Sequence, residues 1–390
     1  MPTTLLVDTN RAAVPLYQAL IKKGHDVWVV GKNPEETLAK MAENYCQLDY
    51  SDASVLSKFI EERNIDFLVP GCTDLSYTMC AKVGDGKFLG IDTVENTHKI
   101  NSKDAFKELT RRLSIPVPKL LLQDEAVNYP SVIVKPVDSF SGQGIQVLRY
   151  PDAQQLGTAI DAAYKVSKSK TALIEEYISG QLYSYSCFFQ AGRVVAGFFV
   201  QEDGSANPFT VDTSQVTNDL AESLQLSLES DVCKIAEELG ISDGLVHLQF
   251  LSDGDKYWVI EMTRRCPGDI YALLIEYATG YEYSDSYIAP FIGEKVKAAP
   301  RPEIKRNIIR HTVTSKPGQT FWGLQFERAT NVILFVPLVT SGEAAKPNDC
   351  IRLGVMFIES HSKEEQLQLY EHLISRSLYQ LNFPGGSNES

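Results

Sequence analysis

A chain of 390 residues exceeds the size at which one hydrophobic core keeps growing, so two or three domains are expected. Hydrophobic residues make up 44% of the chain and charged residues 22%, which is typical of soluble globular proteins. The formal net charge of −13, without any run of Lys or Arg, disfavours nucleic acid or an anionic membrane as the main partner.

The first 71 residues alternate short apolar strands with helices. This βαβαβ order predicts a parallel sheet with right-handed crossovers. The first strand–helix turn, residues 8–13, contains no glycine, so a pyrophosphate could not approach the backbone closely and dinucleotide binding is disfavoured. The expected strands are residues 4–8, 25–31 and 65–71, and the expected helices are residues 12–24, 35–43 and 54–64.

Polar residues follow the first and last of these strands. Ligands of open α/β sheets lie at the carboxyl ends of the strands, which is also where helix N-caps lie. These residues are therefore candidate substrate contacts, with helix capping as the alternative. They are Thr9, Asn10, Cys72, Thr73 and Asp74.

A lysine opens the next helix, which is predicted for residues 103–113 with Ser102 as its N-cap. The helix dipole is positive at this end and disfavours a cation. Lys103 is therefore either solvated or kept for an anionic ligand.

Residues 131–145, SVIVKPVDSFSGQGI, predict a strand–loop–strand hairpin. A β-branched strand ends at Lys135, Pro136 interrupts the ladder, and residues 139–144 form a small-residue loop. Its glycines let backbone N–H groups approach an anion. No helix follows, unlike in the dinucleotide fingerprint and the P-loop. The pattern predicts a flexible flap over nucleotide phosphates, and an ordinary glycine turn is the alternative.

A second hairpin is predicted from strands at residues 245–251 and 257–263, joined by an Asp-Gly turn. In this hairpin Gln249 and Glu261 can lie opposite one another. A carboxylate on an otherwise apolar strand is costly unless a cation or a hydrogen bond compensates. Because Mg²⁺ uses oxygen ligands near phosphate, a magnesium site is predicted here, with a buried salt bridge from Glu261 to Arg265 as the alternative.

Three further residues extend this site. Thr263 shares a face with Glu261, because side chains on a strand repeat every two residues. Arg264 and Arg265 follow at once, and both guanidiniums could bind phosphate or carboxylate.

From residue 300 the pattern is rich in strands and ends in a helix predicted for residues 362–383. The Pro-Arg-Pro segment at 300–302 is the expected domain boundary. The seven cysteines are scattered without a CxxC pair, which indicates free thiols rather than a disulfide framework or a zinc site. No secretory pattern or long apolar span occurs, so a cytoplasmic location is expected.

Taken in order, these pieces resemble the ATP-grasp superfamily, in particular carboxylate–amine ligases and proteins like carbamoyl-phosphate synthase. The resemblance spans roughly residues 4–295. It implies an α/β fold with a Rossmann-like pre-ATP-grasp domain at 1–97 and a two-lobed α+β ATP-grasp domain at 98–299. The small lobe would be about 115–175, and a small α+β module would occupy 300–390. The matching segments are residues 65–84, 101–119, 133–145, 173–180 and 247–269.

Carried over position by position, the resemblance implies ATP and Mg²⁺ as cofactors, with Mn²⁺ as a substitute. Arg265 and Lys135 would be the catalytic residues, with Arg265 stabilising the transferred phosphoryl group. The remaining roles would be phosphate binding by Lys103 and Lys135, flap closure by Ser141, Gly142 and Gly144, adenine binding at a hinge formed by Glu175, Glu176, Tyr177 and Ile178, and metal binding by Gln249, Glu261 and Thr263.

The chain departs from the family pattern in two places. Gln181-Leu182-Tyr183 stands where an acidic residue usually holds the ribose, and Thr263 and Gln249 stand where Asn and Glu are common. The resemblance implies that a small-molecule carboxylate is activated as an acyl phosphate and joined to an amine. An ATP-binding protein without turnover and a bicarbonate-using carboxylase are the alternatives. No nucleic acid or membrane partner is expected, and a homodimer is left open.

Overall fold

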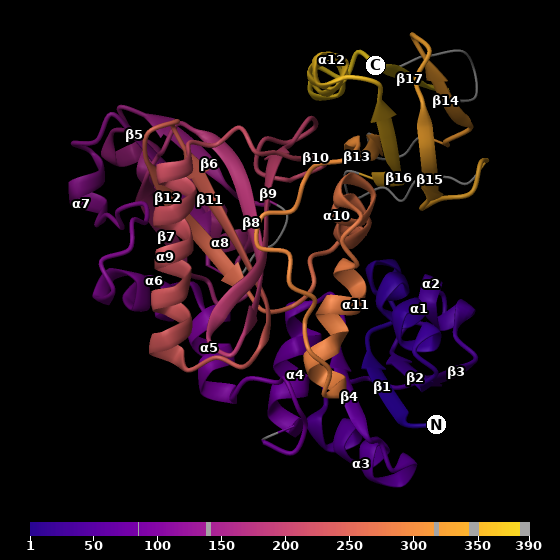
Figure 1. Ribbon diagram of the computed structural model, residues 1–390. Coiled ribbons are helices and arrows are strands. Elements are labelled where there is room, and N and C mark those ends of the chain that lie inside the picture. Colours follow the sequence, from indigo (N-terminus) through magenta and orange to yellow (C-terminus); the bar gives the residue numbers. More distant parts are fainter. Residues whose placement is uncertain (85, 138–141, 316–319, 343–350, 383–390) are drawn as a thin grey trace.

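The N-terminal part of the chain is a parallel sheet in the order β3-β2-β1-β4, as the βαβαβ pattern predicts (Figure 1). The computed structural model describes residues 1–84, 86–137, 142–315, 320–342 and 351–382. The strands are β1 (Thr3–Val7), β2 (Asp26–Gly31), β3 (Asn44–Gln47) and β4 (Phe67–Pro70). The helices are η1 (Arg11–Ala13), α1 (Val14–Lys22), α2 (Thr37–Met41), α3 (Ala53–Arg63) and α4 (Asp74–Gly84).

Local sequence signals explain where these helices begin and end. Pro15 lies in the first turn of α1, where its missing N–H costs no helical hydrogen bond. The side chain of Asp52 accepts hydrogen bonds from the first N–H groups of α3. Asn64 ends α3 in the left-handed conformation, with φ +48°. Two helices then lead out of this domain, α5 (Val94–Asn101) and α6 (Lys103–Arg112).

A second, three-stranded antiparallel sheet has the order β6-β5-β7. Helix α8 covers it and buries Leu156 and Ala159 against Val132 and Val134. The pairing of β5 with β6 confirms that the glycine-rich segment joins two strands. The elements are α7 (Gln123–Ala126), β5 (Ser131–Pro136), β6 (Gln146–Arg149), α8 (Ala153–Val166) and β7 (Ala172–Glu176).

The centre of the molecule is an eight-stranded antiparallel sheet in the order β12-β11-β8-β9-β10-β13-β16-β15. The strands that follow residue 300 therefore continue the sheet formed by the preceding part of the chain. Its strands are β8 (Gln181–Gln190), β9 (Arg193–Asp203), β10 (Thr213–Val216), β11 (Gly244–Ser252), β12 (Tyr257–Thr263), β13 (Asn307–Ser315), β15 (Val332–Pro337) and β16 (Ile351–Ser360).

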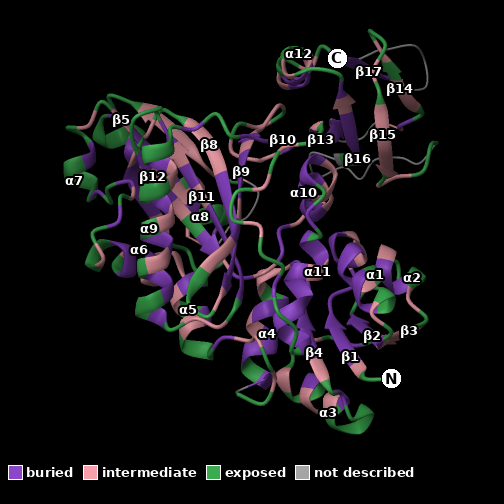
Figure 2. Ribbon diagram, in the orientation of Figure 1, coloured by how far each residue is buried: buried purple, intermediate pink, exposed green. Residues whose placement is uncertain are grey.

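Helices cover this sheet and bury its apolar side chains (Figure 2). Helix α9 (Glu222–Leu239) packs Leu228 and Val232 with Phe250 and Val259 of the sheet, and ends at a left-handed Gly240. The remaining elements are α10 (Tyr271–Thr279), α11 (Tyr283–Ile288), η2 (Ala289–Ile292), β14 (Gly323–Phe326), α12 (Lys363–Ile374) and β17 (Tyr379–Asn382).

The helix predicted for residues 362–383 is wrong in its last third. Helix α12 ends at Ile374, and Arg376 adopts a left-handed φ of +57°. The chain then forms β17, which pairs with β14 and buries Tyr379 and Leu381 on one face. The alternation of these two residues is a strand signal, and the helical spacing before them obscured it.

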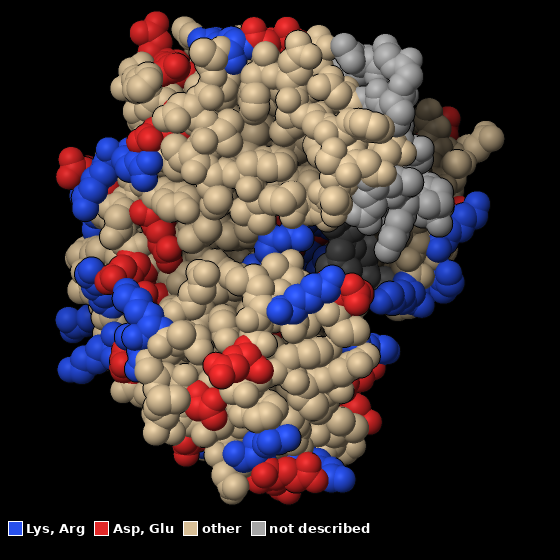
Figure 3. Space-filling model, turned by 90° about the vertical axis from the view of Figure 1, so that its right-hand side faces the viewer, with Lys and Arg blue, Asp and Glu red and all other residues tan. Residues whose placement is uncertain are grey.

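On the face shown in Figure 3, acidic and basic side chains of the described residues are intermixed. This face therefore lacks the extended positive surface that a polyanion such as nucleic acid would need. The six cysteines that the structure describes carry free thiols, as their spacing predicts. Among the described helices, none combines the length and apolar character needed to cross a membrane.

Candidate functional site

Three lysines gather around one buried carboxylate beneath the glycine hairpin. Lys135, near the end of β5, places its Nζ 2.6 Å from Oε2 of Glu175 on β7, and Lys107 of α6 pairs with the other oxygen, Oε1. The Glu175 side chain is only 2% exposed. Lys103, one turn earlier on α6, donates a hydrogen bond to the carbonyl of Pro136 at 3.3 Å. The structure thus brings the two predicted lysines together and adds Lys107, which sequence reasoning missed.

Burial, with a smaller contribution from neighbouring charges, lowers the pKa values of Lys135 and Lys107. Burial, followed by the charges of Lys107 and Lys103, lowers the pKa of Lys135 to about 7, while Glu261 opposes the shift. Burial also lowers the pKa of Lys107 to about 8. Glu261 lies on β12, the edge strand of the large sheet, and of the neighbouring charges that act on the pKa of Lys135 it is the one that raises it.

The flap glycines are needed for packing as well as for backbone conformation. Gly142 and Gly144 have φ values of +68° and +75°. A Cβ at Gly142 would lie 2.8 Å from Cβ of Phe209, and one at Gly144 would lie 2.9 Å from Cγ of Pro136. Ser141, also predicted for the flap, lies outside the described residues. Phosphate binding by the flap amides stays a prediction.

The predicted hinge follows directly from β7. The N–H of Glu176 donates to the carbonyl of Lys119 at 3.0 Å, and its carboxylate accepts the Lys119 N–H at 2.9 Å. The Tyr177 N–H donates to the carbonyl of Ser131 at 3.0 Å. Within the described part of the chain, the Ile178 N–H has no backbone partner. An unpaired donor at this position is compatible with the predicted contact to an adenine edge, which remains untested.

The predicted metal-binding hairpin has the expected register, with Gln249 opposite Glu261. Glu261 is exposed, and among the described residues its carboxylate has no hydrogen-bond or ion-pair partner. The alternative salt bridge to Arg265 is therefore wrong. The Gln249 amide nitrogen donates to Oε2 of Glu202 at 2.6 Å, which leaves the amide oxygen available as a ligand.

Glu202 of β9 is a second carboxylate at this site, and sequence reasoning missed it. It is buried and accepts a hydrogen bond from the Ser184 hydroxyl at 2.8 Å. Burial raises the pKa of Glu202; the hydrogen bonds from Ser184 and Gln249 oppose the shift, and the charge of Glu261 adds to it. Its distance of 47 residues from Gln249 leaves no local signal.

The side chains at this site offer a set of oxygen atoms as possible ligands for a divalent cation. No cluster of three or more His, Cys, Asp and Glu side chains able to hold a metal occurs among the described residues. The set is instead an exposed, unpaired Glu261, the amide oxygen of Gln249 and the nearby Glu202. Carboxylate and amide oxygens are hard ligands, so the residues present fit Mg²⁺, with phosphate oxygens completing the shell.

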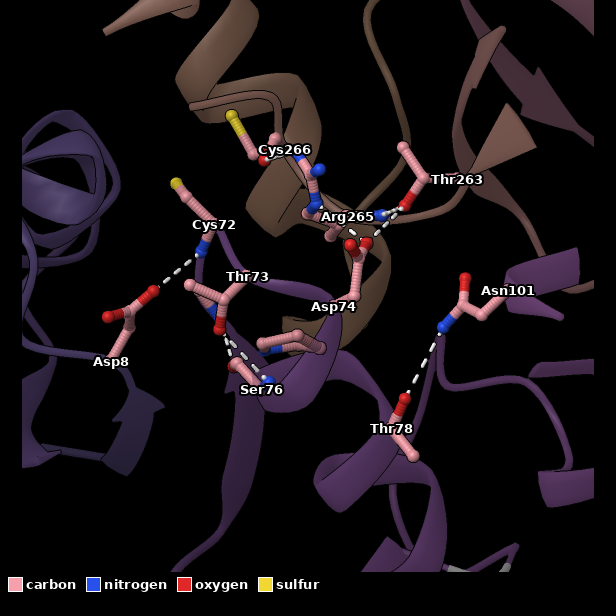
Figure 4. A network of polar contacts seen from close by, with 12 residues as sticks. Asp8, Cys72, Thr73, Asp74, Ser76, Thr78, Asn101, Thr263, Arg265 and Cys266 are labelled. Atoms are coloured by element: carbon pink, nitrogen blue, oxygen red, sulfur yellow. Dashed lines mark hydrogen bonds and ion pairs between the residues drawn. The ribbon is translucent and has the colours of Figure 1, made fainter. Parts of the chain in front are cut away.

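Arg265 is held by the N-terminal domain (Figure 4). Its Nε donates to Oδ1 of Asp74 at 2.8 Å, and the hydroxyl of Thr263 donates to the same oxygen at 3.2 Å. Asp74 opens α4, so the βα turn after β4 meets the end of β12 here. The structure therefore brings the predicted substrate contact Asp74 to the predicted catalytic Arg265.

The neighbouring Arg264 points away from this site into the protein. Its Nε donates to Asp92 at 2.6 Å, and its Nη2 donates to the Ser242 carbonyl at 2.7 Å. A third bond joins Nη1 to the Leu245 carbonyl at 2.5 Å. The side chain is 3% exposed. The expectation that both arginines could bind an anionic ligand is thus wrong for Arg264, because all its nitrogens are engaged inside the fold.

Among the other predicted contacts of the N-terminal domain, Asn10 and Thr73 cap their own turns, and the Asn10 side chain accepts from the Ala12 N–H at 2.8 Å. Thr9 and Cys72 instead bond to other elements. Asp8 accepts from the N–H groups of Asn10 and Cys72, and burial raises the pKa of its carboxyl to about 6 against these two bonds. Thr9 donates to Glu36. Thr73 accepts from the N–H of Ser76 at 3.1 Å. The capping alternative therefore describes Asn10 and Thr73 well.

An arginine cluster that sequence reasoning missed surrounds Asp269. Arg352 of β16 pairs with Asp269 at 2.6 Å, and Arg310 of β13 lies 3.8 Å from the other oxygen. Burial lowers the pKa of Arg11, which the charge of Asp269 partly restores. Within the described residues, the buried Nε of Arg310 has no hydrogen-bond partner. Two guanidiniums paired with one carboxylate carry a net positive charge, and Asp269 follows Arg265 by four residues in the chain.

Comparison with known proteins identifies the class. A family model for the ATP-grasp domain matches residues 127–272. The chain is 24% identical over 226 residues to phosphoribosylamine–glycine ligase of Pyrococcus furiosus, covering 54% of this chain and 52% of that protein. It is 25% identical over 285 residues to the C-terminal section of the carbamoyl phosphate synthase large chain of Methanopyrus kandleri, covering 66% and 50%. The chain thus spans about half the length of these curated relatives.

Solved structures share the fold over nearly the whole chain. Phosphoribosylglycinamide synthetase of Anaerococcus prevotii matches with a TM-score of 0.75 at 15% identity, covering 98% of this chain and 99% of that one. The L-amino acid ligase of Bacillus licheniformis matches with a TM-score of 0.77 at 16% identity, covering 99% of both. Residues 127–272 match the ATP-grasp family, and the fold of the whole chain is that of these full-length structures, as predicted.

Proposed function

We propose that the protein is an ATP-dependent carboxylate–amine ligase. In the first step the γ-phosphoryl group of ATP would pass to a substrate carboxylate, giving ADP and an acyl phosphate. An amine would then displace phosphate from that carbonyl and form a C–N bond. The observation that carries the proposal is that the buried Lys135–Glu175 pair and the facing Gln249 and Glu261 all lie within residues 127–272, which match the ATP-grasp domain.

In this proposal each group at the site has a defined task. Lys103 and Lys135 would bind phosphate oxygens, and Glu261 with Gln249 would hold Mg²⁺. The metal ion would offset the negative charge on the phosphates when bound. A solved relative, the biotin carboxylase domain of Hydrogenobacter thermophilus 2-oxoglutarate carboxylase, was crystallised with MgADP and supports this assignment. Arg265, oriented by Asp74, would offset charge on the transferred phosphoryl group.

The acid substrate would lie between Arg265 and the arginine cluster at Asp269. An acyl phosphate needs positive groups on the side away from ATP, and this cluster supplies them from η1, β13 and β16. The flap around Gly142 would exclude water and so protect the acyl phosphate from hydrolysis. A homodimer is proposed by analogy with the carboxylase domain dimer, and light scattering after size exclusion would test it.

The test is carboxylate-dependent ADP release by purified protein with Mg²⁺ and panels of amino acids and hydroxy acids, with and without an amine. ADP release that requires both substrates supports the ligase. Release that requires bicarbonate instead would indicate a carboxylase. ATP binding measured by calorimetry without turnover on any panel would identify a nucleotide-binding protein without ligase activity and overturn the proposal.

A further inference from the structure

The pairing of Glu175 with two lysines raises a question about nucleotide binding. Each carboxylate oxygen of Glu175 contacts one ammonium group, Lys135 at Oε2 and Lys107 at Oε1. The two lysine side chains are each 16% exposed and the glutamate 2%. Lys135 lies on β5, the strand beneath the flap, whereas Lys107 lies on helix α6, which precedes β5 in the chain.

The proposed function requires Lys135 to turn from this carboxylate to a phosphate. If Lys135 were the only partner of Glu175, that movement would leave a buried carboxylate without a counter-charge, which is strongly unfavourable. Lys107 removes this difficulty, because it remains on Glu175 while Lys135 moves. Its position on α6 is fixed by the cap of Ser102 and by the buried Phe106 and Leu109 on the same helix.

We propose that Lys107 is a positioning residue: it stays paired with Glu175 and balances its negative charge, so that Lys135 can move to the phosphates. Lys107 acts through Glu175 and does not itself contact ATP. The inference rests on the proposed nucleotide site and adds to it a residue that governs ATP affinity. It makes a specific statement about coupling: the effect of Lys107 on ATP depends entirely on the presence of the Glu175 charge.

A double-variant experiment tests this coupling, with the dissociation constant of ATP and Mg²⁺ measured by calorimetry. Lys107→Met keeps the length of the side chain and removes its charge, so Lys135 stays on Glu175 and the dissociation constant rises roughly 10- to 100-fold. Adding Glu175→Gln removes the carboxylate that holds Lys135 back, and affinity returns to within about threefold of Glu175→Gln alone. Lys107→Arg keeps the charge and keeps affinity close to that of the unmodified protein.

Lys99→Met is the matched control, because Lys99 forms a 2.6 Å pair with Glu95 on the exposed face of α5. It leaves ATP affinity unchanged. Thermal unfolding of every variant separates loss of stability from loss of affinity. If the single variant Lys107→Met does not fold, the ATP affinities of the double variant and of Glu175→Gln alone still test the coupling.

Three results would overturn the inference. An ATP dissociation constant of Lys107→Met equal to that of the unmodified protein would make the pair purely structural. ATP binding by the double variant as weak as by Lys107→Met would make Lys107 a direct phosphate contact. Failure of the unmodified protein to bind ATP would instead refute the nucleotide site itself, and with it both proposals.

Discussion

The buried pair between Arg264 and Asp92 fastens the N-terminal domain to the body of the molecule, and its removal can be predicted in detail. Asp92 is 4% exposed and also accepts hydrogen bonds from the Tyr77 hydroxyl at 2.9 Å and from the Ser242 N–H at 2.8 Å. Burial lowers the pKa of Arg264, but the charge of Asp92 and the neighbouring Tyr77 raise it by more, so the guanidinium stays charged. Arg264→Met therefore leaves a charged carboxylate in the interior.

Breaking one side of a buried ion pair costs about 3–5 kcal/mol. The two hydrogen bonds that remain on Asp92 place the loss toward the lower end of this range, about 3–4 kcal/mol. The backbone carbonyls of Ser242 and Leu245 also lose their hydrogen-bond donor, which further lowers the stability of the variant. Urea unfolding followed by tryptophan fluorescence measures the change in the free energy of unfolding.

Arg265→Met is the matched control, because it alters the adjacent arginine in the same way. Arg265 is 22% exposed and pairs with an Asp74 side chain that is 38% exposed, so stability falls by no more than about 1 kcal/mol. Arg264→Met combined with Asp92→Asn removes both charges and costs less than the sum of the single changes. Equal losses for the two arginine variants, or strict additivity in the double variant, would refute the assigned roles.

Three further predictions concern the proposed nucleotide site. Glu261→Gln weakens Mg²⁺-dependent ATP binding by at least about tenfold in calorimetry and leaves the melting temperature unchanged, because its carboxylate has no partner among the described residues; an equal drop in affinity without Mg²⁺ would contradict the metal assignment. ATP affinity falls as the pH rises above 7, by at most about tenfold per unit, because phosphate binding needs the ammonium form of Lys135, whose pKa burial and neighbouring lysines lower to about 7; a flat profile between pH 6 and 9 would count against it. Gly142→Ala destabilises the protein by about 1–2 kcal/mol in urea unfolding, because its Cβ would lie 2.8 Å from Cβ of Phe209 at a positive φ. An unchanged free energy of unfolding would show that Phe209 can move away from the added Cβ without cost.

Local pattern was sufficient for the elements that carry the proposed metal site but not for their register. The Asp-Gly turn at residues 253–254 pairs Ser252 with Tyr257 and Phe250 with Val259, a register that would place Gln249 opposite Ile260. A bulge between Gln249 and Phe250 shifts this register by one residue and brings Gln249 opposite Glu261, and the turn does not predict that shift. The exposure of Glu261 could not be predicted either. Its strand reads as apolar, and the sheet edge that leaves the carboxylate open depends on β12 being the outermost strand.

The roles of adjacent arginines were beyond any local rule. Arg264 and Arg265 follow the last residue of β12, where strand alternation no longer fixes direction. Asp92, 172 residues away, draws one into the interior, and Asp74, 191 residues away, holds the other at the site. Residue type alone indicated two ligand-binding cations, whereas partners from the N-terminal domain leave only one.

Glu175 shows the same dependence in a buried carboxylate. The resemblance placed Glu175 among the four residues of the adenine hinge. Only the pairing of β5 with β7 shows that its side chain meets Lys135. Lys107 could have been noticed from sequence, because it lies four residues after Lys103 and therefore on the same face of α6. Lys103 was already expected to bind an anion, so Lys107 on the same face of α6 could bind either a ligand or a carboxylate of the protein. A buried carboxylate without a counter-charge costs more free energy than a lysine without one, so Lys107 is expected to stay paired with Glu175. Lys135 is then the lysine that can bind the phosphates.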